Sequence, residues 1–231
     1  MSNISISAPT DIADIVYRSV TERQLICDIA TGKREFPCAG KNCILLYGDY
    51  GTGKTTLARL LPEAIEKGKG GSNAYFDFIG CSQAMTGPAL MAQIQQRTMY
   101  ISRNYSGYHY IVLDEIDNLS PKAQASLKVT TGRVQTIFIM TTNHIGRIDA
   151  GVLNRSVRVN CNAAHPSAYL PFAQDALVKF GGRALADDKL VPIIERCNGS
   201  VREITEQMQN IAARQKANPA SPNDPATNAV V

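Results

Sequence analysis

The sequence lacks the patterns that mark membrane and secreted proteins. Its 231 residues contain no stretch that approaches the roughly 18 consecutive apolar residues of a membrane-spanning helix. The first residues, MSNISISAPTDIAD, show no basic segment followed by an apolar core, so they do not indicate a signal peptide. We therefore expect a cytoplasmic protein with no membrane partner.

Patterns for disulfides and metal sites are also missing. The six cysteines and three histidines are scattered along the chain, and no two cysteines form a C-x-x-C pair. Cys38 and Cys43 lie close together, but no second cysteine or histidine pair follows at the spacing of a zinc finger. Small buried thiols in a reducing compartment are the better interpretation, and no metal site built from protein ligands alone is predicted.

Charge and composition exclude little else. A formal net charge of +4 permits nucleic-acid binding without requiring it. The apolar fraction of 44% is ordinary for a globular protein. The length suits one medium α/β domain and a small second domain.

Apolar periodicity alternates between strands and helices in the first two thirds of the chain. The predicted strands are 43–47, 74–79, 110–113, 136–140 and 157–161, and the predicted helices are 21–31, 55–66, 90–99 and 121–129. This alternation is typical of a mainly parallel sheet flanked by helices. From residue 166 the pattern is wholly helical, with helices near 166–180, 186–197 and 201–215, the last begun by a capping box from Ser200 to Glu203. We expect an α/β domain over 1–162, a small helical domain over 163–215 and a disordered, proline-rich tail over 216–231.

A glycine-rich loop follows the first strand. Residues 48–55 read GDYGTGKT, which fits G-x-x-x-x-G-K-[ST]. The glycines let the backbone N–H groups face phosphates, and the next helix directs its positive N-terminal end at them. Lys54 would neutralise phosphate oxygens, and the Thr55 hydroxyl would ligate Mg²⁺. A buried-type strand before the loop and an amphipathic helix after it disfavour a chance match, so the sequence predicts a P-loop that binds ATP·Mg²⁺.

Two acidic residues follow the third predicted strand, and together they form the segment YIVLDE from Tyr110 to Glu115. Asp114 would hold Mg²⁺ directly or through water. Glu115 would polarise the attacking water as a general base. The alternative for Glu115 is a solvated residue at a strand end, because many strands end in acidic residues.

These motifs, in their order and spacing, resemble those of the AAA+ ATPases, and among them the clamp-loader small subunits, over about residues 10–215. The segment YIVLDEIDNLSPKAQASLK is similar to the second carboxylate motif and the helix after it. The segment IFIMTTNHIGRIDAGVLNRSVRV is similar to the sensor-1 strand and arginine-finger region, and IIERCNGSVREITEQMQ is similar to the sensor-2 helix. The resemblance implies a P-loop AAA+ fold, with a parallel five-stranded sheet followed by an all-helical lid.

The resemblance also implies roles for three further residues. Asn143 matches the sensor-1 residue, which orients the attacking water; a loop-capping Asn is the alternative. Arg155 matches the arginine finger, which reaches the nucleotide of a neighbouring subunit, although the family usually shows Ser-Arg-Cys where this chain has NRS; Arg147, Arg158 and a surface arginine are the alternatives. Arg202 matches the sensor-2 arginine, whose alternative is pairing with a nearby carboxylate.

The catalytic prediction is Glu115, Asn143 and Arg155. The predicted metal ligands are Thr55 and Asp114. The predicted nucleotide-binding residues are Gly48, Asp49, Tyr50, Gly51, Thr52, Gly53, Lys54, Thr55, Thr56, Asp114 and Arg202.

The resemblance further suggests where adenine and DNA would bind. The family packs adenine near Ile15, Val16 and Tyr17. Lys122, Lys128 and Arg133 lie on or after the helix that faces DNA in clamp loaders, and an exposed, solvated helix face is the alternative reading.

The chain departs from clamp loaders in one respect, because nothing after Gln215 fits their helical collar domain. The first functional hypothesis is an ATPase that assembles with itself as an open spiral, ring or filament and drives assembly on, or loading of, a DNA replication or recombination partner. The second is an ATP-gated oligomeric switch that recruits a protein partner, as transposition regulators do, with slow turnover. A protein-remodelling motor ranks last, because no aromatic-hydrophobic-Gly pore loop stands at 80–88.

Overall fold

The structure, a computed structural model, describes residues 9–130 and 135–217. The chain divides into two compact units, one ending at Ala163 and the other beginning at Ala164. The boundary predicted from the sequence lies between residues 162 and 163. Each unit is described by itself.

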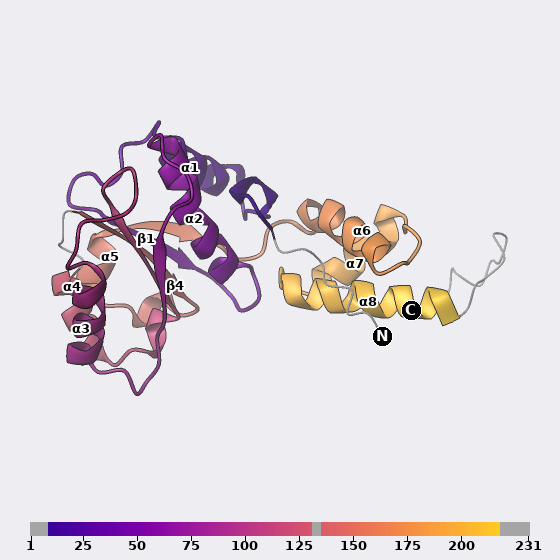
Figure 1. The fold of residues 1–231 in the computed structure, drawn as a ribbon. Helices are drawn as coiled ribbons and strands as arrows, with labels where there is room; N and C mark the ends of the chain where they lie inside the picture. Colours follow the sequence, from indigo (N-terminus) through magenta and orange to yellow (C-terminus); the bar gives the residue numbers. More distant parts are fainter. Residues whose placement is uncertain (1–8, 131–134, 218–231) are drawn as a thin grey trace. The chain divides into compact units, whose positions relative to one another are not determined.

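The first unit contains a parallel sheet of five strands in the order β2-β3-β4-β1-β5 (Figure 1). The strands are β1 (Cys43–Tyr47), β2 (Phe76–Gly80), β3 (His109–Asp114), β4 (Thr136–Thr142) and β5 (Ser156–Asn160). The helices are α1 (Val20–Ala30), α2 (Lys54–Gly68), α3 (Gly87–Arg97), α4 (Pro121–Thr130) and α5 (Ala150–Asn154), with short 3-10 turns η1 (Ile12–Asp14), η2 (Ile116–Asn118) and η3 (Ile145–Arg147). The predicted fold class is confirmed. Because all five strands run parallel, their carboxyl ends lie along one edge of the sheet.

Helices cover both faces of the sheet, with α1 and α2 on one side and α3, α4 and α5 on the other (Figure 1). Successive side chains of β1 alternate between these two cores. Cys43 and Leu45 pack among residues of α3 and α4, whereas Ile44 and Leu46 pack among residues of α1 and α2. Burial on both faces explains why the central strands read as unbroken apolar runs.

The start of one strand and a short helix are among the differences from the prediction. β2 begins at Phe76 rather than at residue 74, because side chains bind the backbone of the two preceding residues. Glu63 accepts the N–H of Ala74 at 2.6 Å, and Asn104 accepts the N–H of Tyr75 at 2.7 Å. The short helix α5 was not predicted, because its five residues are too few to show a helical period.

The second unit is helical, with η4 (Pro166–Tyr169), α6 (Leu170–Lys179), α7 (Asp187–Arg196) and α8 (Val201–Ala217). The Ser200 hydroxyl caps α8 by accepting the N–H of Glu203 at 3.3 Å, but the N–H of Ser200 donates to the Cys197 carbonyl rather than completing the predicted capping box. α8 continues two residues past the predicted end, and the rest of the predicted tail lies outside the described residues. Within the described ranges, no helix has the length and apolar character needed to cross a membrane.

Candidate nucleotide-binding site

The P-loop connects the carboxyl end of β1 to the start of α2. Gly51 and Gly53 have φ of 77° and 87°, a left-handed conformation that glycine adopts without strain. Gly48 is constrained by space as well, because a Cβ placed there would lie 2.7 Å from the backbone nitrogen of Asn162. Asn162 also accepts the N–H of Asp49 through its side-chain oxygen at 2.9 Å. The loop is therefore braced by the segment that follows β5, and Asn162 was not predicted as part of the site.

Lys54 lies at the first position of α2 and is only 7% exposed. Its ammonium group donates to the carbonyl oxygens of Gly48 at 2.9 Å and Asp49 at 2.5 Å. Burial lowers the pKa of the Lys54 amino group, and neighbouring acidic groups partly oppose this shift. The Lys54 side chain therefore lies inside the P-loop, at the position where the motif requires a cation for phosphate.

The predicted metal ligands meet at the carboxyl end of β3. The Thr55 hydroxyl donates to Asp114 Oδ1 at 2.9 Å, so an oxygen from α2 and one from β3 lie side by side. The same Oδ1 accepts a second hydrogen bond, at 2.7 Å, from the hydroxyl of Thr141 on β4. Hydroxyl and carboxylate oxygens are the ligands that Mg²⁺ prefers, and it usually keeps several waters, so this pair suits it. Among the described residues, no group of three or more His, Cys, Asp or Glu side chains could hold a metal by itself.

Glu115 lies just past the end of β3, exposed to solvent. Its backbone is left-handed, with φ of 58° and ψ of 52°, which is uncommon for a residue other than glycine. The N–H of Glu115 donates to the Thr141 hydroxyl at 2.8 Å, and its carboxylate accepts from the Asn118 side chain at 3.0 Å. The general base predicted from the sequence is thus held on a turn beside the metal ligands.

Asn143 immediately follows β4, which pairs with β1 on one side and β3 on the other. This confirms the expectation that its strand lies beside the Asp114 strand. The N–H of Asn143 donates to Asp117 Oδ1 at 3.3 Å, which joins it to the turn after Glu115. Sequence reasoning did not include Asp117 among the site residues; its position two residues after Glu115 was the available signal.

The remaining P-loop residues make contacts within the loop or with its neighbours. The Thr52 hydroxyl donates to the Asp49 carbonyl at 2.9 Å, which closes the turn. The Tyr50 hydroxyl lies 3.2 Å from His144 Nε2, and the two rings meet edge to face. Thr56 is half-buried in the first turn of α2. The structure therefore brings together the predicted P-loop, Asp114, Glu115 and Asn143.

Arg155 lies at the opposite edge of the sheet. It caps the end of α5 and immediately precedes β5, so it stands at the amino end of a strand whose carboxyl end faces the P-loop side. Its guanidinium donates to the Gly151 carbonyl at 3.2 Å. Within one chain, the structure does not bring Arg155 to the P-loop.

Two other predictions concern residues away from the metal ligands. Arg202 is exposed in the first turn of α8, which belongs to the second unit, so its predicted role stays a prediction. Ile15 and Tyr17, in the predicted adenine region, pack against the same core as Cys161. Burial raises the pKa of the Cys161 thiol to about 12, so this thiol stays protonated at neutral pH.

The predicted DNA-facing lysines differ in their surroundings. Lys122 is exposed in the first turn of α4. The aliphatic part of the Lys128 side chain packs against Gly151 of α5, where an added Cβ would lie 2.5 Å from Lys128 Cδ. Arg133 lies outside the described residues.

Comparison with known proteins identifies the family and shows similar folds. The family model of the ATPase family associated with various cellular activities (AAA) matches residues 44–162, just over half of the 231 residues. The solved structure of a point mutant of Thermotoga maritima RuvB is 15% identical, with a TM-score of 0.67, over 91% of this chain and 68% of that one. The T. maritima RuvB Holliday junction branch migration motor is 14% identical, with a TM-score of 0.66, over 91% and 66%.

The chain therefore spans about two thirds of these RuvB chains, and at this low identity the likeness shows the fold alone. A search of curated proteins found no match. The more specific resemblance to clamp loaders stays a prediction. The family match covers the P-loop, Asp114, Glu115 and Asn143. The chain belongs to the ATPase family associated with various cellular activities and is a nucleotide-binding P-loop ATPase.

Proposed function

We propose that this chain hydrolyses ATP·Mg²⁺ at sites shared between neighbouring copies of itself, and that hydrolysis drives assembly on, or loading of, a DNA replication or recombination partner. The observation that carries the shared site is the position of Arg155 at the edge of the sheet opposite the P-loop. Five residues of β5, at about 3.3 Å each, separate the two edges by roughly 15 Å. An arginine there is suited to reach the nucleotide of the next subunit.

The other residues divide the chemistry within one subunit. The P-loop N–H groups and Lys54 bind the phosphates, and Thr55 with Asp114 would hold the metal. When bound, Mg²⁺ neutralises charge that develops on the phosphoryl oxygens. Glu115 accepts a proton from the attacking water, which the side chain of Asn143 helps to orient.

The sensor-2 assignment belongs to the same proposal. Arg202 stands in the first turn of α8, where a cation opposes the helix dipole. A bound phosphate would remove this disadvantage, so we propose that Arg202 contacts the phosphates of a bound nucleotide.

Mixing two inactive variants tests the shared site. Glu115→Gln removes the base and Arg155→Ala removes the finger, so each should lose turnover alone. In an equal mixture, about one interface in four pairs an intact base with an intact finger, so activity should return to roughly a quarter of wild type. The matched control is Arg158→Ala, an exposed arginine on β5 that should leave turnover near normal. No recovery in the mixture, or an active Arg155→Ala protein, would refute the shared site.

DNA as the partner rests on two observations. The fold is similar to that of T. maritima RuvB, a Holliday junction branch migration motor. Lys122 is exposed at the start of α4, and repeated copies in an oligomer would add weak phosphate contacts.

Fluorescence anisotropy with a labelled duplex tests DNA binding. Binding should need ATP, fall steeply with salt and weaken in Lys122→Glu, while nucleotide affinity stays unchanged. Absence of ATP-dependent binding at low salt would reject DNA as the partner and favour the second candidate.

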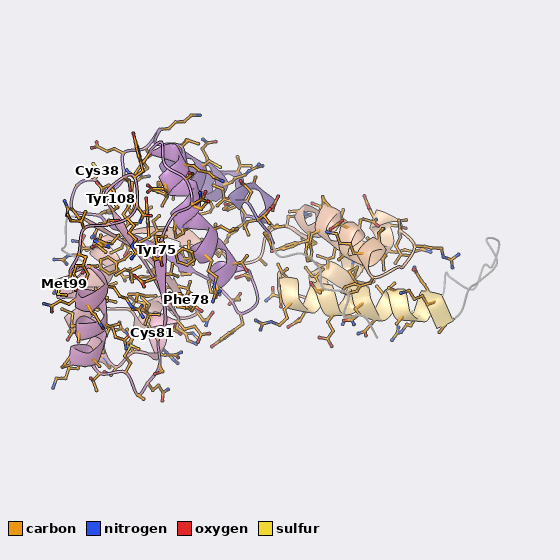
Figure 2. The ribbon with its side chains drawn as sticks, in the orientation of Figure 1. Cys38, Tyr75, Phe78, Cys81, Met99 and Tyr108 are labelled. Carbon is orange, nitrogen blue, oxygen red and sulfur yellow. The ribbon has the colours of Figure 1, made fainter. Side chains whose placement is uncertain are left out.

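The second candidate is an ATP-gated oligomer that recruits a protein partner, and an exposed surface favours it. Five of the eight large apolar or aromatic side chains that are exposed among the described residues belong to the segment 99–105 or to Tyr75, which is hydrogen-bonded to Asn104 of that segment: Tyr75, Met99, Tyr100, Ile101 and Tyr105. Tyr100 is 73% exposed and Ile101 is 95% exposed. Tyr75 and Met99 are labelled on the α/β unit in Figure 2. Exposed patches of this composition, rich in Tyr and Met, are typical of protein interfaces.

The loop that carries this surface is held in place. The Asn104 side chain bonds both the N–H and the carbonyl of Tyr75, and the guanidinium of Arg103 lies 5.2 Å from the Tyr75 ring centre. Tyr100→Ser with Ile101→Ser should therefore leave ATP turnover and self-assembly unchanged. A loss of either, measured by phosphate release or sedimentation, would show that the surface serves the ATPase cycle and not a separate partner.

A further inference from the structure

Thr141 connects Asp114 and Glu115 from the strand that precedes Asn143, and no role was predicted for it from the sequence. It is the sixth of the seven residues of β4, is 1% exposed, and pairs in register with Leu46 of β1. Its hydroxyl donates to Asp114 Oδ1 at 2.7 Å and accepts the N–H of Glu115 at 2.8 Å. One hydroxyl therefore uses its single donor and one acceptor position on consecutive residues of the neighbouring strand.

The two residues it contacts both need to be oriented. Glu115 has a left-handed backbone, which is sterically unfavourable for a residue with a Cβ. The hydrogen bond from its N–H to Thr141 holds that peptide in place. Asp114 accepts its other hydroxyl bond from Thr55 of the P-loop helix, so Thr141 supplies the contact that ties the carboxylate to the sheet.

We infer that Thr141 is a positioning residue for ATP hydrolysis. Its hydroxyl aligns the metal-binding carboxylate of Asp114 with the peptide that presents Glu115 to the attacking water, and it does so through these two residues without touching the nucleotide. This inference rests on the roles proposed for Asp114 and Glu115. A threonine that only filled the core would need its methyl group and volume, whereas this role needs the hydroxyl oxygen.

Substitutions at Thr141 separate the hydroxyl from the volume. Thr141→Val keeps the branched shape and removes both hydrogen bonds, and Thr141→Ser keeps the hydroxyl and removes a methyl group. Thr141→Val should lower kcat by roughly tenfold to a hundredfold and raise KM for ATP·Mg²⁺ by much less, because misplaced groups cost mainly transition-state binding. Thr141→Ser should keep kcat near wild type. Thr136→Val is the matched control, because Thr136 is also buried on β4 but stands at its other end.

A binding measurement gives a readout that does not depend on turnover. In titrations with a fluorescent ATP analogue, Thr141→Val should bind as tightly as wild type without Mg²⁺, because the P-loop is intact. Adding Mg²⁺ should strengthen its binding less than it does for wild type, because Asp114 is no longer held toward the metal position. Thr136→Val should respond to Mg²⁺ as wild type does.

If Thr141→Val fails to fold, the pair Thr141→Ser and Thr141→Ala still decides the question, because these variants differ only in the hydroxyl oxygen. Equal kcat and equal Mg²⁺ response in that pair, or a wild-type kcat in Thr141→Val, would overturn the inference. The outcome is separable from the proposed function, which is tested by Glu115→Gln. An inactive Glu115→Gln beside a fully active Thr141→Val would reject only the role of Thr141.

Discussion

Replacing Glu66 with alanine should destabilise the α/β unit far more than replacing an exposed carboxylate of the same helix. Glu66 lies near the end of α2 with no exposed surface. Its carboxylate accepts the N–H of Ser106 at 2.8 Å, the Ser106 hydroxyl at 2.6 Å and the Tyr110 hydroxyl at 2.8 Å. One buried carboxylate thus fixes both β3 and the loop before it to α2.

The size of the effect follows from these three bonds. Hydrogen bonds to a charged group contribute about 1.5–3 kcal/mol each, but they are not additive, and Glu66→Ala also leaves buried donors without their acceptor. We expect a loss of about 3–5 kcal/mol in the free energy of unfolding. Glu66→Gln keeps one acceptor oxygen, but its NH2 group would face a donor where the second carboxylate oxygen now accepts one. We therefore expect a loss of about 1–3 kcal/mol in the free energy of unfolding.

Urea unfolding followed by circular dichroism measures the effect, with the slope against urea checked for constancy. The control is Glu63→Ala on the same helix, whose partly exposed carboxylate pairs with Lys67 at 3.4 Å and accepts one backbone N–H. That control should lose no more than about 2 kcal/mol. If Glu66→Ala were no more costly than Glu63→Ala, the buried network would not be what holds this loop.

Two further predictions concern the P-loop. Gly48→Ala should abolish tight ATP binding in equilibrium titration and lower the melting temperature, because its Cβ would lie 2.7–2.8 Å from the backbone of Cys161 and Asn162. A normal ATP affinity would show that the segment after β5 can move to accept the methyl group. Burial lowers the pKa of the Lys54 ammonium below its ordinary value of 10.5, and phosphate prefers the protonated form, so ATP affinity should fall as pH rises through that lowered pKa. Titrations with a fluorescent ATP analogue from about pH 7 to about pH 10 should show this decline, and an affinity that is flat across the range would contradict it.

Much of the fold is readable from the sequence because the central strands are buried on both faces. Runs such as CILLY at 43–47 must pack on both sides, so their ends are visible where polar residues or glycine begin, and β1 lies where it was predicted. The strand β4 was predicted to end at Met140 but continues through Thr142. A threonine after an apolar run does not show from the sequence whether the strand continues. In the structure, Thr141 and Thr142 pair with Leu46 and Tyr47 of β1, so the strand includes them.

The site is only partly readable, because spacing along the chain identifies a motif but not the groups that support it. The P-loop, Asp114 and Glu115 follow from local pattern and chain order. Thr141 lies on β4 and Asn162 just after β5, both distant in sequence from the P-loop, and only the pairing of β4 and β5 with β1 brings them to the site. Glu66 was not predicted either, since a glutamate in an amphipathic helix normally faces solvent.

The brace behind the P-loop also determines how the chain leaves the α/β unit. Asn162 is tied at both ends, with its side chain on the N–H of Asp49 and its own N–H on Asn160 Oδ1 at 3.0 Å. The second unit begins at Ala164, two residues later. The segment that leads to the helical unit is therefore bonded to the nucleotide loop itself, so a change in the backbone at Asp49 would act directly on that segment.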